Sequence, residues 1–421
     1  MKRLTRREVL AAPAALAAQQ PRPNLVFLFS DDHHYQCLGA AGNPHIHTPN
    51  LDRLAARGTL FASGIVSTPQ CCPSRGIMSS GLEIYQSGLE SNGRKDFRPN
   101  LGPTVIEQLS SAGYETTQIG KWHIDRPQAA VGFQKAPLWL RGGSSPYRDP
   151  ELRRGFVDRG EKIPGHITDL FTDAAIDYVR GATRPYFLWL SYNAPHTPWF
   201  AADRYRARYA GKSSLAPPNH PPGGRDFDWV TYYSVITHLD EAIGRLLAAL
   251  DGNTVVFFVG DNGFMCGTKN WNGKVVPWEE SIRVPFIAAG GPFAKGGRSD
   301  APVASVDVPA TWLDLAGVRP KSPLAGRSLV KAAGFDAAFA SWTDGRPEAL
   351  AVKQRVEPYR VVRTRTHKYI LWESGKQAVY DWRADPGEEK DLSADASLLS
   401  PLREKLAARI HSTADQQARA W

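Results

Sequence analysis

The chain has 421 residues, 42% hydrophobic and 22% charged, which is the composition of a globular protein and not of a disordered one. No apolar run reaches the ~18 residues of a membrane-spanning helix, so we do not expect an integral membrane protein. The net charge of +9 suits an anionic substrate or a solvated basic surface, and without a nucleic-acid motif or a dense basic helix we expect no nucleic-acid binding.

The first 20 residues have the layout of an export signal. They combine a basic start, an Ala/Leu-rich middle and a small-residue site at Ala15–Ala17. The stretch Thr5–Leu10 resembles a twin-arginine signal, which in bacteria exports folded proteins. A short amphipathic helix is the alternative. We exclude residues 1–20 from the fold and expect a periplasmic or secreted protein.

Apolar runs alternate with amphipathic segments over the next 240 residues. This pattern predicts strands at 24–29, 114–119, 186–190 and 254–259, and helices at 48–58, 104–112, 169–180 and 230–250. Such alternation favours an α/β fold, with a mostly parallel sheet sandwiched by helices. Polar residues follow three of the strands, where ligands of parallel sheets bind.

The pattern changes from about Gly334 onward. Residues 360–365 and 368–372 predict short antiparallel strands with turns at Thr366 and Gly375, and residues 400–412 predict a closing helix. We therefore divide the chain into the export signal (1–20), a main catalytic domain (21–334) and a smaller C-terminal α+β domain (335–421).

The most informative segment is Cys71-Cys72-Pro73-Ser74-Arg75, with a glycine at position 81. It resembles the signature of the type I sulfatases, members of the alkaline phosphatase superfamily, in which a Cys or Ser precedes x-P-S-R. The resemblance implies an alkaline-phosphatase-like fold and conversion of the first residue to formylglycine by a maturation enzyme. The reactive position is Cys71, because Pro stands two residues later, and Cys72 takes the variable position.

A hydrated aldehyde explains why such a residue serves in ester hydrolysis. One of its two hydroxyls attacks the ester, and the other later expels the bound group. If a helix begins at the motif, Arg75 lies about one turn from residue 71 and can neutralise charge there.

Oxygen-bearing side chains end two of the predicted strands. Carboxylate and amide oxygens suit a hard cation, and the absence of thiolate or imidazole ligands argues against zinc. The resemblance implies Ca²⁺, with Mg²⁺ less favoured, held together with the oxygen of residue 71. The implied metal ligands are Asp31, Asp32, Cys71, Asp261 and Asn262.

Three further segments match the family. The first contains Lys121 and His123, which the resemblance places on the sulfate and the nucleophile. His196, in a P-H-x-P turn, and Lys274, before E-E-S-x-R-V-P, are implied to protonate the leaving oxygen. The implied catalytic residues are thus Cys71, Arg75, Lys121, His123, His196 and Lys274, with Asp261 helping to deprotonate the hydrate.

The chain departs from the family pattern at three places. Trp278 replaces a tyrosine, Ser79-Ser80 replace Leu-Thr, and Lys269-Asn270 stand where His-Gly often precedes the lysine. The last departure concerns the loop that would contact the leaving group. None of the three removes an implied ligand or the nucleophile.

Two other groups of residues invite a chemical interpretation. One comprises His33, His34, His45 and His47. It lacks a partner that would support zinc, and His33 or His34 better suits a pocket wall beside Asp32. Cys37 and Cys266 each follow an implied ligand pair, so a disulfide and two buried free thiols both stay open.

These observations predict a sulfuric ester hydrolase. The basic charge and 12 tryptophans favour a sulfated carbohydrate cleaved in an exo manner, with aryl or choline sulfates as alternatives. A phosphonate or phosphate ester hydrolase of the same superfamily is the nearest rival, but those enzymes tend to have His at the position of Asn262 and lack the second acid of Asp31-Asp32. A non-catalytic protein that binds sulfated glycans is the third hypothesis. Loops 136–166, with five arginines, and 197–229 are expected to form the selectivity pocket.

Overall fold

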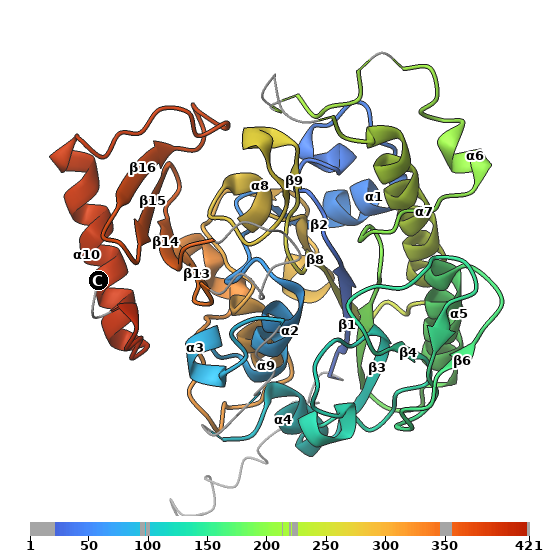
Figure 1. The fold of residues 1–421 in the computed structure, drawn as a ribbon. Helices are drawn as coiled ribbons and strands as arrows, with labels where there is room; N and C mark the ends of the chain where they lie inside the picture. Colours follow the sequence, from blue (N-terminus) through green and yellow to red (C-terminus); the bar gives the residue numbers. More distant parts are fainter. Residues whose placement is uncertain are drawn as a thin grey trace, which may run out of the picture.

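The computed structural model describes residues 22–92, 97, 102–212, 214–218, 220, 226–345 and 356–418, so the predicted export signal lies outside the described residues. The centre of the fold is an eight-stranded sheet (Figure 1). The five strands from β8 to β4 are parallel, whereas β11 is antiparallel to both neighbours. In spatial order the strands are β12 (Arg298–Ser299), β2 (Gly58–Phe61), β11 (Phe286–Ala289), β8 (Thr254–Gly260), β1 (Asn24–Ser30), β7 (Tyr186–Ser191), β3 (Glu115–Lys121) and β4 (Trp139–Leu140).

Strand β1 shows why helices cover both faces of the sheet. Leu25, Phe27 and Phe29 pack into one hydrophobic layer, and Val26 and Leu28 pack into the other. All five side chains are fully buried, as expected for a strand covered on both sides. The first layer includes α2 (Cys71–Ser80), α4 (Val105–Ser111) and α9 (Asp307–Leu315), and the second includes α1 (Pro49–Arg57), α5 (Ile167–Gly181) and α7 (Trp229–Leu247).

The α/β prediction is confirmed, and the four predicted strands are β1, β3, β7 and β8. The prediction for α7 extended three residues too far, since the helix ends at Leu247. Shorter elements that the sequence pattern did not indicate complete the main domain. These are α3 (Ile84–Ser87), α6 (Asp203–Arg206), α8 (Glu279–Ile282) and the strand pairs β5 (Glu151–Leu152) with β6 (Glu161–Lys162) and β9 (Met265–Cys266) with β10 (Asn272–Gly273).

The C-terminal part forms a smaller α+β unit, drawn in red and orange in Figure 1. Its four antiparallel strands are β13 (Ala338–Trp342), β14 (Tyr359–Arg363), β15 (His367–Trp372) and β16 (Gln377–Asp381). Helix α10 (Ala396–Ser412) packs on this sheet through Leu402, Leu406 and Ile410.

Two predicted boundaries in this unit were wrong. Helix α10 begins at Ala396 and not near residue 400, because Asp395 caps it by accepting a hydrogen bond from the Ser397 amide at 2.9 Å. Strand β14 ends at Arg363 and not at residue 365, because the amide of Thr364 already donates to the carbonyl of His367 in the turn.

A buried ionic group joins the two units, and we call Glu279, Glu388, Arg363 and Lys368 the boundary cluster. Arg363 binds both carboxylate oxygens of Glu279, at 3.0 and 2.8 Å, and Lys368 pairs with Glu388. The Glu388 carboxylate also accepts from the Glu279 amide at 2.8 Å. Burial raises the pKa of Glu279, but Arg363 and Lys368 outweigh burial and lower it to about 2.

All four cysteines are buried and none is in a disulfide, so Cys37 and Cys266 are not bonded to each other. Both belong to one apolar cluster beside α7. Across the described part of the chain, no helix combines the length and apolar character that a membrane crossing requires.

Candidate active site

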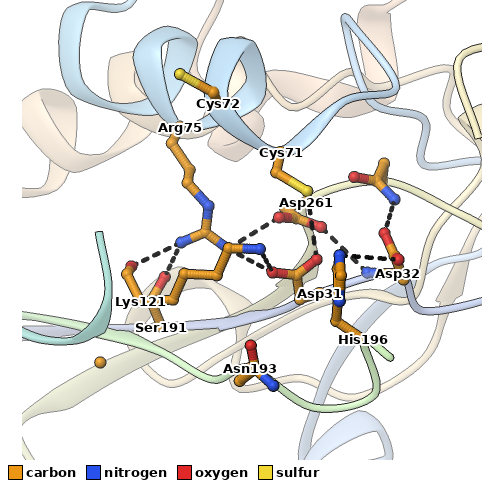
Figure 2. Close-up of polar contacts among 12 residues, drawn as sticks. Asp31, Asp32, Cys71, Cys72, Arg75, Lys121, Ser191, Asn193, His196 and Asp261 are labelled. Atoms are coloured by element: carbon orange, nitrogen blue, oxygen red, sulfur yellow. Dashed lines mark hydrogen bonds and ion pairs between the residues drawn. The ribbon is translucent and has the colours of Figure 1, made fainter. Parts of the chain in front are cut away.

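The predicted site residues meet at the carboxyl ends of the parallel strands. Asp31 and Asp32 follow β1, Asp261 and Asn262 follow β8, and Lys121 is the last residue of β3. Because neighbouring parallel strands end at the same edge, residues far apart in sequence lie side by side (Figure 2).

Three acids form the centre of the site, and we call Asp31, Asp32 and Asp261 the carboxylate cluster. Their exposed fractions are 0%, 3% and 0%. The Asp32 amide donates to Asp261 Oδ1 at 3.2 Å, and Asp32 adopts a positive φ of 59°. Burial, followed by the charge of Asp31, raises the pKa of Asp261 to about 6. The acids therefore repel one another unless cations balance them.

Arg75, which lies in helix α2 on one face of the sheet, contacts two of these acids. Its Nη2 lies 3.2 Å from Asp31 Oδ2 and 2.9 Å from Asp261 Oδ2. Its Nη1 donates to the Lys121 carbonyl at 2.8 Å and to Ser191 Oγ at 2.6 Å (Figure 2). Arg75 is fully buried, so its planar guanidinium fixes the positions of all these groups.

Two lysines supply further positive charge. Lys121 Nζ contacts Asp31 Oδ2, and Lys274 Nζ contacts Asp32 Oδ1. Burial would raise the pKa of Asp31, but Lys121, His196, Lys274 and Arg75 outweigh it and hold that pKa well below its usual range. The site thus balances three acids with three buried or largely buried cations.

Helix α2 begins at Cys71, which meets the condition for Arg75 to lie about one turn away, and the two cysteine side chains point in different directions (Figure 2). Cys71 Sγ lies 3.5 Å from Asp31 Oδ1 and 2.8 Å from Lys274 Nζ. Cys72 packs instead in the hydrophobic layer between the sheet and helices α2, α4 and α9, and its sulfur points away from the acids in Figure 2. Burial and the charge of Asp31 raise the pKa of the Cys71 thiol to about 12, so the unmodified side chain is protonated.

The two predicted catalytic histidines occupy different positions. His196 Nε2 lies 3.6 Å from Asp32 Oδ2, on the same carboxylate that Lys274 contacts. His123, with a φ of 57°, follows β3, and its Nδ1 is buried without a hydrogen-bond partner in the described structure. Burial lowers the pKa of His123 well below its usual range, and Lys121 and Arg75 lower it further. A Cβ at Gly143 would lie 2.9 Å from the His123 ring, so glycine there allows the loop to pass closely.

The donor set at the carboxylate cluster fits a hard cation. Single ligand atoms of Asp31, Asp32, Cys71 and His196 lie within 4.8 Å of one another. Asn262 donates its amide protons to Asp32 Oδ1 at 2.7 Å and to the Gly263 carbonyl at 2.8 Å, which leaves its buried Oδ1 without a partner in the described structure. An orphaned amide oxygen beside carboxylates is a suitable ligand for a cation such as Ca²⁺.

The four N-terminal histidines do not assemble into a metal site among the described residues. His33 bridges Ser30 Oγ, at 3.1 Å, and the Cys37 carbonyl, at 2.9 Å, and is fully buried. His34 Nε2 lies 3.6 Å from Glu280. Both rings hold the loop after β1 in place.

The three departures from the family pattern lie away from the carboxylate cluster. Lys269 donates to the Glu388 carbonyl at 3.0 Å and so faces the C-terminal unit. Trp278 packs against Trp372 and Tyr380 at the same boundary. The hydroxyls of Ser79 and Ser80 bond back to carbonyls of their own helix.

Sequence reasoning missed three residues at this site. Ser191 binds Arg75, Asn193 has a buried amide with no partner in the described structure, and Tyr147 donates to the His196 carbonyl at 2.8 Å. Ser191 ends β7, so the rule that selected Asp31 could have identified it. Tyr147 lies in a loop and carries no such signal.

Comparisons with known proteins agree with this geometry. The model of the family described as "Sulfatase" matches residues 23–318, and the model described as "N-sulphoglucosamine sulphohydrolase, C-terminal" matches residues 267–416. A relative from Formosa agariphila, "Ulvan-active sulfatase", is 27% identical over 88% of this chain and 77% of its own length.

Solved structures share the fold. One, described as a complex with its substrate D-glucosamine-2-N,6-O-disulfate, has a TM-score of 0.80 and 23% identity, covering 94% of this chain and 98% of that one. The phosphonate monoester hydrolase of Agrobacterium radiobacter has a TM-score of 0.71 and 20% identity, covering 94% and 96%. The fold alone therefore does not separate sulfur from phosphorus esters. The family match, which spans most of the chain, does: this protein belongs to the sulfatase family of the alkaline phosphatase superfamily and is a sulfatase.

Proposed function

We propose that the protein releases inorganic sulfate from a sulfated carbohydrate, acting at a chain end, with residue 71 as formylglycine and Ca²⁺ as cofactor. The observation that carries this proposal is the position of Cys71. Its sulfur faces Asp31 and Lys274 at the start of α2, next to the carboxylate cluster and the free oxygen of Asn262.

The cation would be held by Asp31, Asp32, Asp261, Asn262 and residue 71. The hydrated aldehyde would supply the attacking hydroxyl, while the cation would neutralise charge on that hydroxyl and on the sulfate. Mg²⁺ demands a tighter octahedral site and is the less favoured ion.

The remaining side chains orient the ester and move protons. Arg75 holds Asp31 and Asp261 in place, and Asp261 accepts the proton of the attacking hydroxyl. Lys121 supplies positive charge for the sulfate oxygens. These roles agree with the contacts of each residue inside the site.

Two candidate proton donors for the leaving oxygen contact the same carboxylate. His196 and Lys274 both contact Asp32, so they lie on the same side of the site and can protonate the leaving oxygen. His123 Nδ1, buried without a described partner, accepts the proton that must leave when sulfate is expelled.

A carbohydrate substrate is supported by the relatives. The C-terminal family model is named for a sulfohydrolase of N-sulphoglucosamine, one relative is named for ulvan, and one structural neighbour holds a disulfated glucosamine. The sequence of residues 1–20 supports twin-arginine export to the periplasm or outside the cell. The motif at Cys71 supports a partner enzyme that generates formylglycine.

The test is sulfate release, in Ca²⁺, from a panel of sulfated oligosaccharides and from 4-nitrophenyl sulfate. The protein is co-produced with a formylglycine-generating enzyme, and the mass of residue 71 is checked first. Cys71→Ala should lower the rate at least about 10⁴-fold, because it removes the nucleophile. Cys72→Ala, the matched control, should stay active because Cys72 lies in the core.

Sulfate release that survives Cys71→Ala would contradict the mechanism. Converted protein that cleaves phosphonate or phosphate esters and no sulfate ester would favour the rival activity. Converted protein that binds sulfated glycans without cleaving any ester would support the non-catalytic alternative.

A further inference from the structure

Planar side chains stack in a column from helix α7 to the protein surface. Tyr205 stacks on His238 with ring centroids 4.5 Å apart, and His238 lies 4.1 Å from His166. The ring centroids of His166 and Phe200 are 6.2 Å apart. The Arg148 guanidinium lies 5.0 Å from the centroid of the Phe200 ring. We call these five residues the planar column. It ends on a guanidinium at the surface.

The two histidines of the column lie near Asp169, but their geometry favours packing over metal binding. The rings are tilted by only 36° at 4.1 Å, whereas a shared metal must lie in the plane of both. Asp169 is already engaged, with His238 Nε2 at 3.0 Å and Arg245 at 2.8 Å. Burial and then His238 lower the pKa of His166 to about 4, so its ring is neutral at pH 7 and adds no charge beside Arg148.

Three of the five arginines in loop 136–166 pair with acids, whereas Arg148 and Arg159 have no acid partner among the described residues, and of these two it is Arg148 that stacks on an aromatic ring. Arg141 pairs with Asp158 at 2.5 Å, and Arg153 pairs with Asp158 at 2.7 Å. Arg154 pairs with Glu161 at 2.7 Å. For Arg148, which is exposed, the described residues provide the Phe200 ring and no acid.

The position of Arg148 is tied to the candidate acid His196. Tyr147, the preceding residue, donates its hydroxyl to the His196 carbonyl at 2.8 Å and is 1% exposed. Phe200, which carries the guanidinium, follows His196 by four residues and is 38% exposed. Arg148 also forms an isolated antiparallel bridge with His166. The guanidinium is therefore held beside the segment that carries the candidate acid His196.

We propose that Arg148 is a specificity-determining residue that binds a second anionic group, a carboxylate or another sulfate, on the saccharide whose sulfate ester is cleaved. The inference rests on the proposed function. A guanidinium presents a planar set of donors that matches both anions, and one stacked in advance loses little conformational freedom on binding.

The test compares substrates that carry one and two anionic groups. It uses 4-nitrophenyl sulfate and pairs of sulfated saccharides that differ only in a second sulfate or a carboxylate, with residue 71 verified as formylglycine. Arg148→Ala should lower kcat/KM for the doubly charged saccharides about 10- to 100-fold, mainly through KM, which is the range of a hydrogen bond to a charged group. Hydrolysis of 4-nitrophenyl sulfate should be unchanged.

Arg154→Ala is the matched control, because it removes an exposed arginine from the same loop that already has an acid partner. It should leave the ratio between doubly and singly charged saccharides unchanged. The inference would be overturned if Arg148→Ala lowered the rate equally on all substrates or left the ratio between doubly and singly charged saccharides unchanged. It would also be overturned if the wild type cleaved 4-nitrophenyl sulfate and none of the saccharides. Converted wild-type protein that cleaves no sulfate ester would refute the proposed function itself.

Discussion

The carboxylate cluster and the boundary cluster are both buried, and in both the acids pair with lysine and arginine side chains. In the boundary cluster Glu279 comes from the main domain, whereas Glu388, Arg363 and Lys368 come from the C-terminal unit, so the ion pair between Glu279 and Arg363 crosses between the units. In the carboxylate cluster three acids come from two adjacent strand ends, with a partnerless Asn262 oxygen beside them. Similar residues therefore serve two purposes: one cluster joins the two units, and the other gathers three acids and an unbonded amide oxygen where a cation can bind.

The largest effect is expected from breaking the carboxylate cluster. Asp261→Asn should lower kcat/KM for sulfate release at least about 10³-fold, because it removes a cation ligand and a proton acceptor in one step. Its free energy of unfolding in a chelator should not fall, because the substitution also removes a charge that repels Asp31. Urea unfolding and initial rates on the same samples measure both. A loss of stability equal to that of a boundary variant would contradict the comparison.

Breaking the boundary cluster should have the opposite result. Glu279→Gln leaves Arg363 without its buried acid, so the free energy of unfolding should fall by about 3–5 kcal/mol at pH 7. The kcat of protein that remains folded should change less than about twofold, because Glu279 contacts no member of the carboxylate cluster. Glu389→Gln, which removes an exposed acid 3.1 Å from Lys269, is the control and should cost less than about 1 kcal/mol.

The pH dependence of the stability difference between the wild type and Glu279→Gln provides a further test. The pKa of Glu279 is lowered in the fold, to about 2, so its contribution is present above its unfolded value of 4.5 and is lost as the pH falls toward 2. The stability gap between the wild type and Glu279→Gln should narrow over that range. A gap that stays constant down to pH 2 would contradict an ionic origin.

A smaller effect is expected from filling the carboxylate cluster. Adding Ca²⁺ to chelated protein at about 100 times its Kd should stabilise the fold by about 2.7 kcal/mol, a rise in Tm of about 3 °C for a chain of this size. Asn262→Ala should reduce the rise, because it removes the free oxygen. Differential scanning fluorimetry measures both without any substrate. No rise with Ca²⁺, together with a rise with Zn²⁺, would reject a hard-cation site.

Local patterns in the sequence predicted which side chains gather at the carboxylate cluster. The first apolar run is followed by Asp31 and a later one by Asp261, so the fold class placed both acids at the same edge of the sheet. The structure adds that β1 and β8 are neighbouring strands. The motif indicated which cysteine faces the site through the position of Pro73 alone. The roles of individual residues remain predictions.

The boundary cluster could not be predicted in the same way. Glu279 and Arg363 are 84 positions apart and lie in different units, and neither stands at the end of a predicted strand. The arginines of loop 136–166 looked equivalent in sequence, and only their contacts in the fold distinguish them, since three pair with acids and Arg148 stacks on Phe200. Both the boundary cluster and the partners of these arginines depend on packing between segments that are distant in sequence. The periodicity of the sequence carries no information about such contacts.

Two hydrogen bonds just after Lys274 attach the loop that carries this lysine to the C-terminal sheet. The Tyr359 hydroxyl donates to the Val275 carbonyl at 3.1 Å, and Lys368 donates to the Pro277 carbonyl at 2.8 Å. The loop that presents Lys274 to residue 71 is thus anchored by residues encoded about 80 to 95 positions later. We therefore expect that a chimera in which the C-terminal sheet is exchanged for that of a relative would need the matching 275–279 segment as well.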